Sequence, residues 1–156
     1  MKLLALECST ARNSLAILEG DRVLAEADWH EPTARSHTLF QHLPMIVDRA
    51  GLRPEDIELC VVGRGPGSYS GLRVAITTAQ ALALPGGRPV RAVDSGAALA
   101  AQAAAEPHAV APWIAVLGDA RRGQLWMGLF QRLENGVLKR SNPWKTFFPE
   151  ELPQAL

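Results

Sequence analysis

Gly63-Arg-Gly-Pro-Gly-Ser-Tyr-Ser-Gly-Leu-Arg73 is the most informative stretch of this chain of 156 residues. It follows the apolar run 57–62 and precedes the segment 70–84, whose residues favour a helix. This order predicts a buried strand that leads into a glycine-rich turn and then into the start of a helix. Free backbone N–H groups and the positive end of the helix dipole meet at such a turn. The turn therefore either binds an anion or allows another backbone to approach closely.

Upstream of this turn, the sequence predicts an antiparallel meander followed by a helix. Three runs indicate strands, at 3–8, 14–19 and 22–29. Gly20-Asp21 is typical of a two-residue hairpin turn between the last two of these strands. Apolar residues at helical spacing predict a helix over 36–50, which Gly51 ends as a C-terminal cap.

Downstream of the turn, we expect helices and strands to alternate before a second meander begins. The expected elements are a helix over 70–84, a strand over 89–93, a helix over 96–105, and strands over 113–117, 124–131 and 137–139. Asp94-Ser95 is a natural N-cap, a turn is expected over 119–123, and Asn135-Gly136 is a strong hairpin signal. The fold class is therefore α/β, a mixed sheet with helices packed on it, with a first lobe over 1–106 and the start of a second over 107–156.

Composition and charge exclude several classes of protein. Sixteen Lys and Arg balance sixteen Asp and Glu, so the chain lacks the basic excess of a nucleic-acid-binding protein. If RNA is involved, a partner is expected to supply most of the contact. No stretch approaches the roughly 18 apolar residues of a membrane span, and the apolar opening run is too short for a secretion signal. We expect a cytoplasmic protein in which Cys8 and Cys60 are small core residues.

Two segments near the predicted strand ends are candidates for binding an anion. The glycine turn is neither a Walker A loop nor a strict G-x-G-x-x-G motif, so its N–H groups over 68–71 either contact an anion or belong to a structural turn. Glu7, Ser9 and Thr10 lie at the end of the first strand, where a carboxylate and hydroxyls on a turn would hold a phosphate and its metal. The alternative is that Ser9 and Thr10 cap the turn.

Histidine and arginine pairs are the remaining candidates. His37 and His42 are five residues apart, a spacing that does not place them on one helix face, so no metal pair is expected. Asp119, Arg121 and Arg122 lie together in the predicted turn. They would clamp a phosphate or a carboxylate, or would pair with one another in a solvated turn.

Together these segments resemble one family, the bacterial TsaB family, also called YeaZ. The matching segments, in the family's order and spacing, are Leu4-Ala-Leu-Glu-Cys-Ser-Thr10, Arg35-Ser-His37, Gly63 to Arg73, Asp94-Ser95 and Asp119-Ala-Arg-Arg-Gly123. The resemblance covers residues 2–150, and the glycine stretch is its most specific part. The family's first strand usually ends in Asp-Thr-Ser where this chain has Glu7-Cys8-Ser9, which weakens the case for a nucleotide site.

The resemblance implies an actin-like (ribonuclease H-like) fold of two related lobes, the second short or incomplete in this chain. It implies a non-catalytic subunit, not an enzyme by itself, which pairs with and activates a TsaD-type catalytic paralogue and works with a TsaE-type ATPase. In the family, this complex makes N6-threonylcarbamoyladenosine at the adenosine 3′ of the tRNA anticodon. ATP and metal are then expected on the partner subunits, tRNA contact only through the complex, and a self-dimer when the chain is alone.

The resemblance also implies which residues meet the partner, since the family's helix after the glycine turn lies in the interface. Those residues are Ser70, Leu72, Arg73, Ile76, Thr77, Gln80, His37 and Leu39. The possible anion or nucleotide contacts are Glu7, Ser9, Thr10, Gly65, Gly67 and Ser68. The alternative function is an actin-like-fold enzyme, either a nucleotide-dependent kinase or a glycoprotease-like peptidase. It would require a glycine hairpin after the first strand and a metal or nucleophile cluster, and the sequence shows neither.

Overall fold

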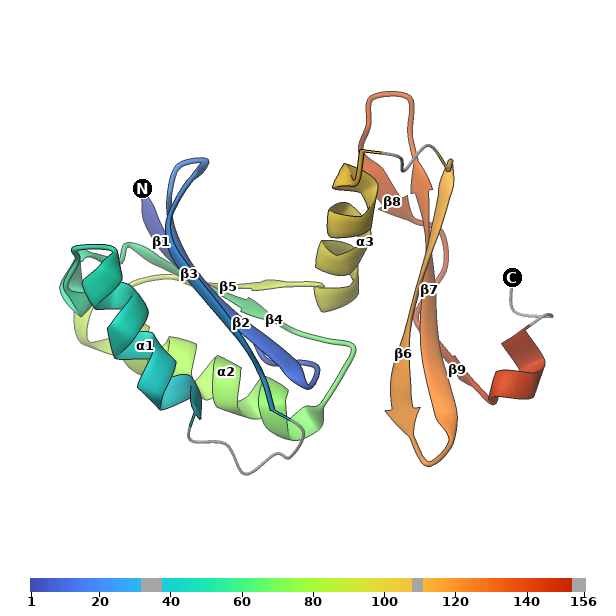
Figure 1. Cartoon of the computed structure of the whole chain (residues 1–156), viewed down its shortest axis with the longest axis horizontal. Helices are drawn as coiled ribbons and strands as arrows, with labels where there is room; N and C mark the ends of the chain where they lie inside the picture. The colour runs from blue at the N-terminus through green and yellow to red at the C-terminus, as the bar shows by residue number, and fades with distance from the viewer. Residues whose placement is uncertain (32–37, 108–110, 153–156) are drawn as a thin grey trace. The chain divides into compact units, whose positions relative to one another are not determined.

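The computed structural model describes residues 1–31, 38–107 and 111–152, which form two compact units, Met1–Val93 and Asp94–Leu156 (Figure 1). This division differs from the lobe boundary expected after residue 106, because helix α3 (Ser95–Ala105) packs against strands of the second unit. Within the described residues, no helix is long and apolar enough to cross a membrane.

The first unit is built on a five-stranded mixed sheet with the order β3-β2-β1-β4-β5. Its strands are β1 (Lys2–Glu7), β2 (Arg12–Glu19), β3 (Arg22–His30), β4 (Leu59–Gly63) and β5 (Val90–Val93). The first three pair antiparallel around the predicted Gly20-Asp21 turn, whereas β4 runs parallel to β1 and β5 parallel to β4. Parallel neighbours need long crossover connections, and the segments that contain the helices provide them.

Two helices, α1 (Thr38–Arg49) and α2 (Tyr69–Ala83), cover one face of this sheet (Figure 1). Gly51 follows α1 with a φ of +66°, which confirms the predicted C-terminal cap. Short 3₁₀ helices, η1 (Pro54–Asp56) and η2 (Leu84–Gly86), lie before β4 and after α2. The order of helices and strands follows the prediction for this unit, with boundaries that move by one or two residues.

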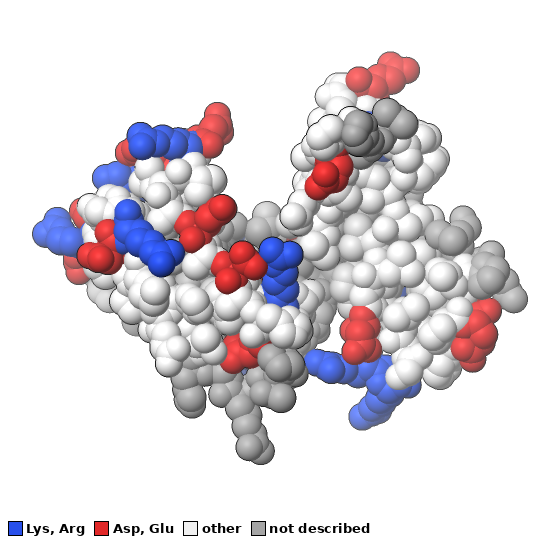
Figure 2. Space-filling model, in the orientation of Figure 1, with Lys and Arg blue, Asp and Glu red and all other residues white. Residues whose placement is uncertain are grey.

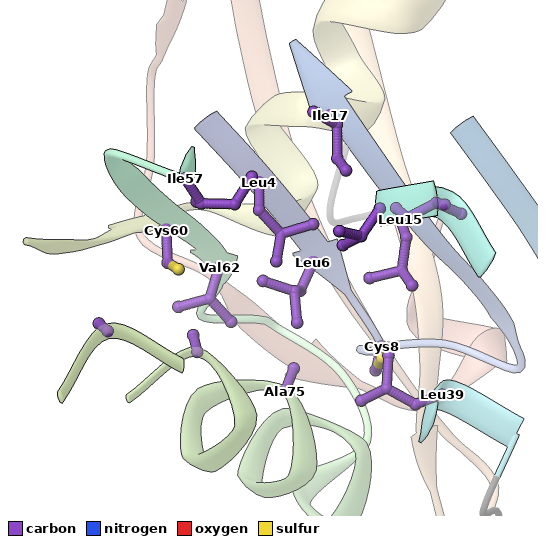
Figure 3. Close-up of a cluster of buried hydrophobic side chains, with 14 residues drawn as sticks. Leu4, Leu6, Cys8, Leu15, Ile17, Leu39, Ile57, Cys60, Val62 and Ala75 are labelled. Atoms are coloured by element: carbon purple, nitrogen blue, oxygen red, sulfur yellow. The ribbon is translucent and has the colours of Figure 1, made fainter. Parts of the chain in front are cut away.

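The core of the first unit lies between the sheet and the two helices (Figure 3). Alternate residues of β1 and β2 point into it, among them Leu4, Leu6, Leu15 and Ile17, none more than 2% exposed. Burying a side chain of this size contributes about 1.5–3 kcal/mol to the free energy of unfolding. Ala75, fully buried, is small enough to let α2 lie close to the sheet.

Cys8 and Cys60 are free thiols buried in this core, as the sequence predicts. Burial is the main cause that raises the pKa of the Cys8 thiol to about 12, and the nearby carboxylates of Glu7 and Glu31 contribute to the same rise. Burial also raises the pKa of Cys60. Neither thiol therefore forms a nucleophilic thiolate near neutral pH.

The second unit contains a smaller sheet and one helix. Its strands are β6 (Trp113–Arg121), β7 (Gln124–Arg132), β8 (Leu138–Arg140) and β9 (Lys145–Phe147), and the 3₁₀ helix η3 (Pro149–Glu151) follows them. All pairings are antiparallel, in the order β6-β7-β8, and β9 also pairs with β7. Trp126, Phe130 and Val116 form the core against Ala100 of α3, with Trp144 packed beside them.

Two predictions for this unit need correction. The turn expected over 119–123 is shorter, because β6 continues through Arg121, which pairs with Gln124, and only Arg122 and Gly123 form the turn. Positive φ angles at Arg121 and Arg122 let the chain reverse this tightly. Strand β9 lies in a polar, Pro-rich segment where the sequence predicts no strand, and its pairing with β7 is a tertiary contact.

Candidate functional site

The glycine turn before α2 packs against the turn between β1 and β2. A Cβ atom added to Gly71 would collide with the carbonyl oxygen of Cys8, and one added to Gly67 would collide with that of Ser9. The Ser68 N–H donates to the Ser9 carbonyl oxygen at 2.6 Å. Glycine is therefore needed here because two backbone segments of this unit meet with no room for a side chain.

Ser68 also caps α2, and two of the four N–H groups over 68–71, those of Ser68 and Gly71, donate to acceptors within the chain. Its Oγ accepts a hydrogen bond from the Gly71 N–H at 3.3 Å, and its carbonyl oxygen accepts one from the Leu72 N–H at 2.9 Å. Gly65, with a φ of +91°, lies next to the side chain of Leu72. The N–H groups of Ser68 and Gly71 thus donate to acceptors within the chain. Anion binding at Gly65, Gly67 and Ser68 stays a prediction.

Glu7, Ser9 and Thr10 form hydrogen bonds that cap the turn after β1. Glu7 Oε1 accepts a hydrogen bond from the Ser9 N–H at 2.6 Å. Thr10 Oγ1 donates to the Arg12 carbonyl oxygen at 2.8 Å and accepts from the Arg12 N–H at 3.2 Å. Ser9 is buried and Thr10 is exposed. These contacts fit the capping interpretation, and a nucleotide contact at the three residues stays a prediction.

A polar cluster around Glu31 joins β2, β3 and the start of α1. The Glu31 carboxylate accepts hydrogen bonds from Asn13 Nδ2 at 3.2 Å, Trp29 Nε1 at 3.4 Å and Thr38 Oγ1 at 2.9 Å. The Trp29 and His42 rings stack with centroids 4.2 Å apart. The sequence carries no signal for this cluster, because its members are brought together only by the packing of α1 on β3.

Metal binding finds no support in the described part of the chain. His42 is engaged in the ring stack, and His37 lies outside the described residues. No group of three or more His, Cys, Asp or Glu side chains among the described residues is arranged to hold a metal ion.

The residues predicted to meet a partner divide into exposed and covered side chains. Ser70, Arg73, Thr77 and Gln80 are exposed on α2, whereas Leu72 and Ile76 are half-buried. Leu39 lies in the core with 2% of its surface exposed, so its side chain is not available to a partner in this conformation. Four exposed side chains of α2 therefore share one accessible face.

Sequence reasoning missed two exposed aromatic residues next to this face. Tyr69 is 74% exposed and Phe40 of α1 is 55% exposed. The Arg73 guanidinium lies 5.7 Å from the Tyr69 ring centroid, a cation–π distance. The sequence did contain a signal that Phe40 is exposed, because Phe40 lies off the stripe of apolar residues, Leu39 among them, that faces the core. Phe40 lines a shallow groove of about 320 Å³ together with Ser70, Arg73, Val74, Thr77 and Thr78.

A second cavity, of about 300 Å³, opens between the far ends of α1 and α2. Leu43 and Val47 of α1 and Leu82 of α2 line it, and Arg88 closes one side. The Arg88 guanidinium donates hydrogen bonds to the carbonyl oxygens of Pro54, Ile57 and Leu82. Arg88 therefore ties η1 and the end of α2 to the start of β5.

The β6–β7 hairpin contains the predicted Asp119, Arg121 and Arg122. Asp119 Oδ1 accepts a hydrogen bond from the Arg121 N–H at 2.6 Å, and its Oδ2 lies 3.7 Å from the Arg121 guanidinium. These two residues therefore pair with each other, as one of the sequence interpretations states. Arg122 is exposed at the tip and has no acceptor among the described residues.

Known proteins share both the sequence and the fold described above. Residues 32–139 match the profile of a family described as "TsaD: tRNA N6-adenosine threonylcarbamoyltransferase". The tRNA threonylcarbamoyladenosine biosynthesis protein TsaB of Bacillus subtilis is 33% identical over 143 residues, which are 92% of this chain and 60% of that protein. The protein of the same name from Escherichia coli is 34% identical over 140 residues, 88% of this chain and 58% of that protein. The chain thus spans about 60% of the length of these relatives.

Solved structures give the same result for the fold. YeaZ from Pseudomonas aeruginosa matches with a TM-score of 0.83 and 32% identity over 95% of this chain and 68% of that one. An activator of 2-hydroxyisocaproyl-CoA dehydratase from Clostridium difficile matches over 96% of this chain and 46% of that one, with a TM-score of 0.56 and 17% identity, a likeness of fold alone. The mixed five-stranded sheet and its helices form the predicted actin-like fold.

Proposed function

Because this chain belongs to the TsaB (YeaZ) family, we propose that it is a non-catalytic subunit that pairs with a TsaD-type catalytic paralogue. The pair takes part in the synthesis of N6-threonylcarbamoyladenosine at the adenosine 3′ of the tRNA anticodon. The chain acts by holding the paralogue in its active form, and it self-associates through the same surface when alone. Support comes from relatives named as biosynthesis proteins of this modified nucleoside.

The single observation that carries the pairing is the exposed face of α1 and α2, here called the pairing face. Its residues are Phe40, Tyr69, Ser70, Arg73, Thr77 and Gln80. Arg73 is the one charged residue of α2, so a second helix pair packs on this face without burying unpaired carboxylates. Exposed aromatic residues next to an arginine are also the side chains that dominate binding energy in protein interfaces.

The contacts of the turn residues support a division of labour within the complex. Ser68 and Gly71 use their N–H groups inside the chain, and Glu7 binds the Ser9 N–H, so these groups stabilise the first unit. We propose that ATP and metal are held by the TsaD-type paralogue and a TsaE-type ATPase, and that tRNA is met only in the assembled complex. Tight, Mg²⁺-dependent ATP binding by the isolated chain would contradict this proposal.

Titration calorimetry of the chain with a TsaD-type partner tests the pairing. We expect Phe40→Ala and Thr77→Arg each to weaken the complex by about tenfold or more, since both change the centre of the groove. Gln102→Arg is the matched control, because it adds the same charge to an exposed position of α3 and should leave the affinity unchanged. Circular dichroism of each variant verifies that the fold is intact.

Two results would overturn the proposal. One is a folded wild-type chain that forms no complex with the partner. The other is a complex whose affinity falls equally with Gln102→Arg and with Thr77→Arg, because the loss would then come from the added charge and not from a contact on α2. Light scattering of the chain alone, with the same variants, shows whether the self-dimer uses the pairing face.

A further inference from the structure

The tip of the β6–β7 hairpin presents two adjacent arginines to solvent. Arg121 ends β6, Arg122 and Gly123 form the turn, and β7 begins at Gln124. Arg121 and Arg122 are both exposed. Figure 2 shows basic side chains that project beyond the surface at this end of the hairpin. Side chains at the tip of such a protrusion can contact a partner that does not contact the rest of the surface.

The backbone of this tip is unfavourable for arginine. Arg121 has a φ of +70° and Arg122 a φ of +53°, and they are the only non-glycine residues with positive φ in the described ranges. Gly123 has a φ of +76°. A two-residue turn with positive φ at both positions favours Asn-Gly, Asp-Gly or Gly-Gly, because other side chains crowd the backbone in that conformation.

Another two-residue hairpin, in the first unit, follows the usual rule. Between β2 and β3 the position with positive φ is Gly20, with a φ of +60°. The second unit therefore places a long cationic side chain where the fold by itself favours Asn or Gly. Unfavourable local choices that persist in a folded protein are found most often at functional positions.

Asp119 holds the tip in this conformation. Its Oδ1 accepts the Arg121 N–H, which stabilises the positive φ of that residue, and its Oδ2 pairs with the Arg121 guanidinium at 3.7 Å. The tip carries one carboxylate and two guanidinium groups, and the carboxylate pairs with Arg121 alone, so the tip has a net positive charge. Arg122 carries that charge with no acceptor among the described residues, and its five N–H donors match the geometry of a phosphate group.

We propose that the hairpin tip is an RNA-phosphate contact, with Arg122 as the binding residue and Asp119 and Arg121 as the residues that position it. This inference rests on the proposed function, which brings tRNA to the complex. The chain has equal numbers of acidic and basic residues, so one projecting arginine orients the RNA backbone and supplies little of the total affinity. Contacts to phosphate carry no base specificity, so the tip should not discriminate between tRNA sequences.

Substitution of Arg122 by Asn is expected to change the stability of the chain and its affinity for tRNA in opposite directions. Arg122→Asn places a residue suited to positive φ in the turn, so the melting temperature of the chain should rise by about 2 °C. The same variant, paired with the TsaD-type partner, should bind tRNA roughly fivefold more weakly at moderate salt. The slope of log affinity against log salt concentration should fall by about one, the value for one lost phosphate contact.

Arg22→Asn is the matched control, because it removes one exposed arginine beside the other hairpin, where φ is not positive. It should change neither the melting temperature nor the salt slope. An unchanged salt slope for Arg122→Asn, in complexes that form normally, overturns the inference and leaves the proposed function standing. Loss of partner binding in Arg122→Asn also overturns it, since the tip would then be a protein contact. Failure of the wild-type chain to pair overturns the proposed function and this inference with it.

Discussion

The two units of this chain each contain a three-stranded antiparallel meander, and they differ in how their cores are filled. β1, β2 and β3 form a meander in the first unit, and β6, β7 and β8 form one in the second. The first core is aliphatic and lies under α1 and α2, whereas the second is built around Trp126, Phe130 and Trp144. The difference teaches that the same meander can be covered in two ways. In one, helices and turns approach the sheet closely; in the other, large aromatic side chains fill the space.

Glycine shows the contrast most directly. In the first unit, Gly67 and Gly71 leave room for the backbone of the β1–β2 turn. In the second unit, Gly96 and Gly128 leave room for the ring of Trp144. A side chain can shift to accommodate a new methyl group, but a backbone held by hydrogen bonds on both sides cannot. The first unit is therefore the less tolerant of the two at its glycines.

The largest expected effect is that of Gly71→Ala. Its new Cβ meets the carbonyl oxygen of Cys8, so we expect the free energy of unfolding to fall by about 3 kcal/mol or more, measured by urea denaturation. Gly128→Ala should cost less, about 1.5 kcal/mol, because its new methyl meets a ring that can move. Ser70→Ala, exposed in the same helix as Gly71, is the control and should stay within about 0.5 kcal/mol. Equal losses for the two glycine variants would break the comparison.

Trp144→Ala tests the aromatic core and should cost about 3 kcal/mol. The Trp144 ring meets Trp126 edge-on with centroids 5.3 Å apart, and its centroid lies 5.9 Å from that of Phe130. Hydrogen exchange resolved by region should show the loss of protection in β7 and α3. Trp113→Ala removes a ring that is 48% exposed and should cost less than about 1 kcal/mol. An equal loss from Trp113→Ala would show that the ring cluster does not carry the stability of this unit.

Asp94 joins three parts of the second unit, and its loss should cost about 2 kcal/mol in Asp94→Ala. Its carboxylate accepts hydrogen bonds from the Ala97 N–H and from Trp144 Nε1, both at 3.0 Å, and from the Arg140 guanidinium at 2.7 Å. Asp94→Asn keeps a good helix cap and loses mainly the charge, so about 0.5 kcal/mol is expected. Thermal melts of both variants measure the difference. If Asn were as costly as Ala, the ion pair with Arg140 would dominate instead of the cap.

The smallest expected effect is a pH dependence confined to the first unit, which holds both cysteines. Folding raises the Cys8 pKa from 9.0 to about 12. The protonated thiol therefore contributes fully to stability below pH 9, and this contribution is lost as the pH rises from 9 to about 12. We expect the free energy of unfolding to be lower by about 1 kcal/mol at pH 10 than at pH 8. The measurement is the difference between wild type and Cys8→Ala, which should lack this change. An identical pH dependence in both would show that the thiol does not titrate differently on folding.

Much of the fold was predictable from local signals. Gly20-Asp21, Gly51 and Asp94 mark a hairpin, a helix end and an N-cap by the chemistry of single residues, and the structure has each where predicted. Strand β9 and the extension of β6 were not predictable, because pairing with β7 decides both. Helix α3 was predicted, but only packing shows that it belongs to the second unit.

The candidate site divides in the same way. The sequence identifies α2 as the helix after the glycine turn, and helical periodicity is enough to place Ser70, Arg73 and Thr77 on one face. Helical spacing puts Leu39 on the apolar stripe of α1 and Phe40 off it, but only the tertiary structure shows that Leu39 is buried and that Phe40 lines one groove with Ser70 and Arg73.

By itself, the sequence determined the α/β class, the order of strands and helices, and the family, because these depend on spacing, caps and motifs along the chain. Tertiary structure decided what the glycines are for. Gly67 and Gly71 face the backbone of Cys8 and Ser9, which lie about sixty residues away in the sequence. No local pattern encodes such a contact, since it forms only when α2 and the β1–β2 turn are held together by the core.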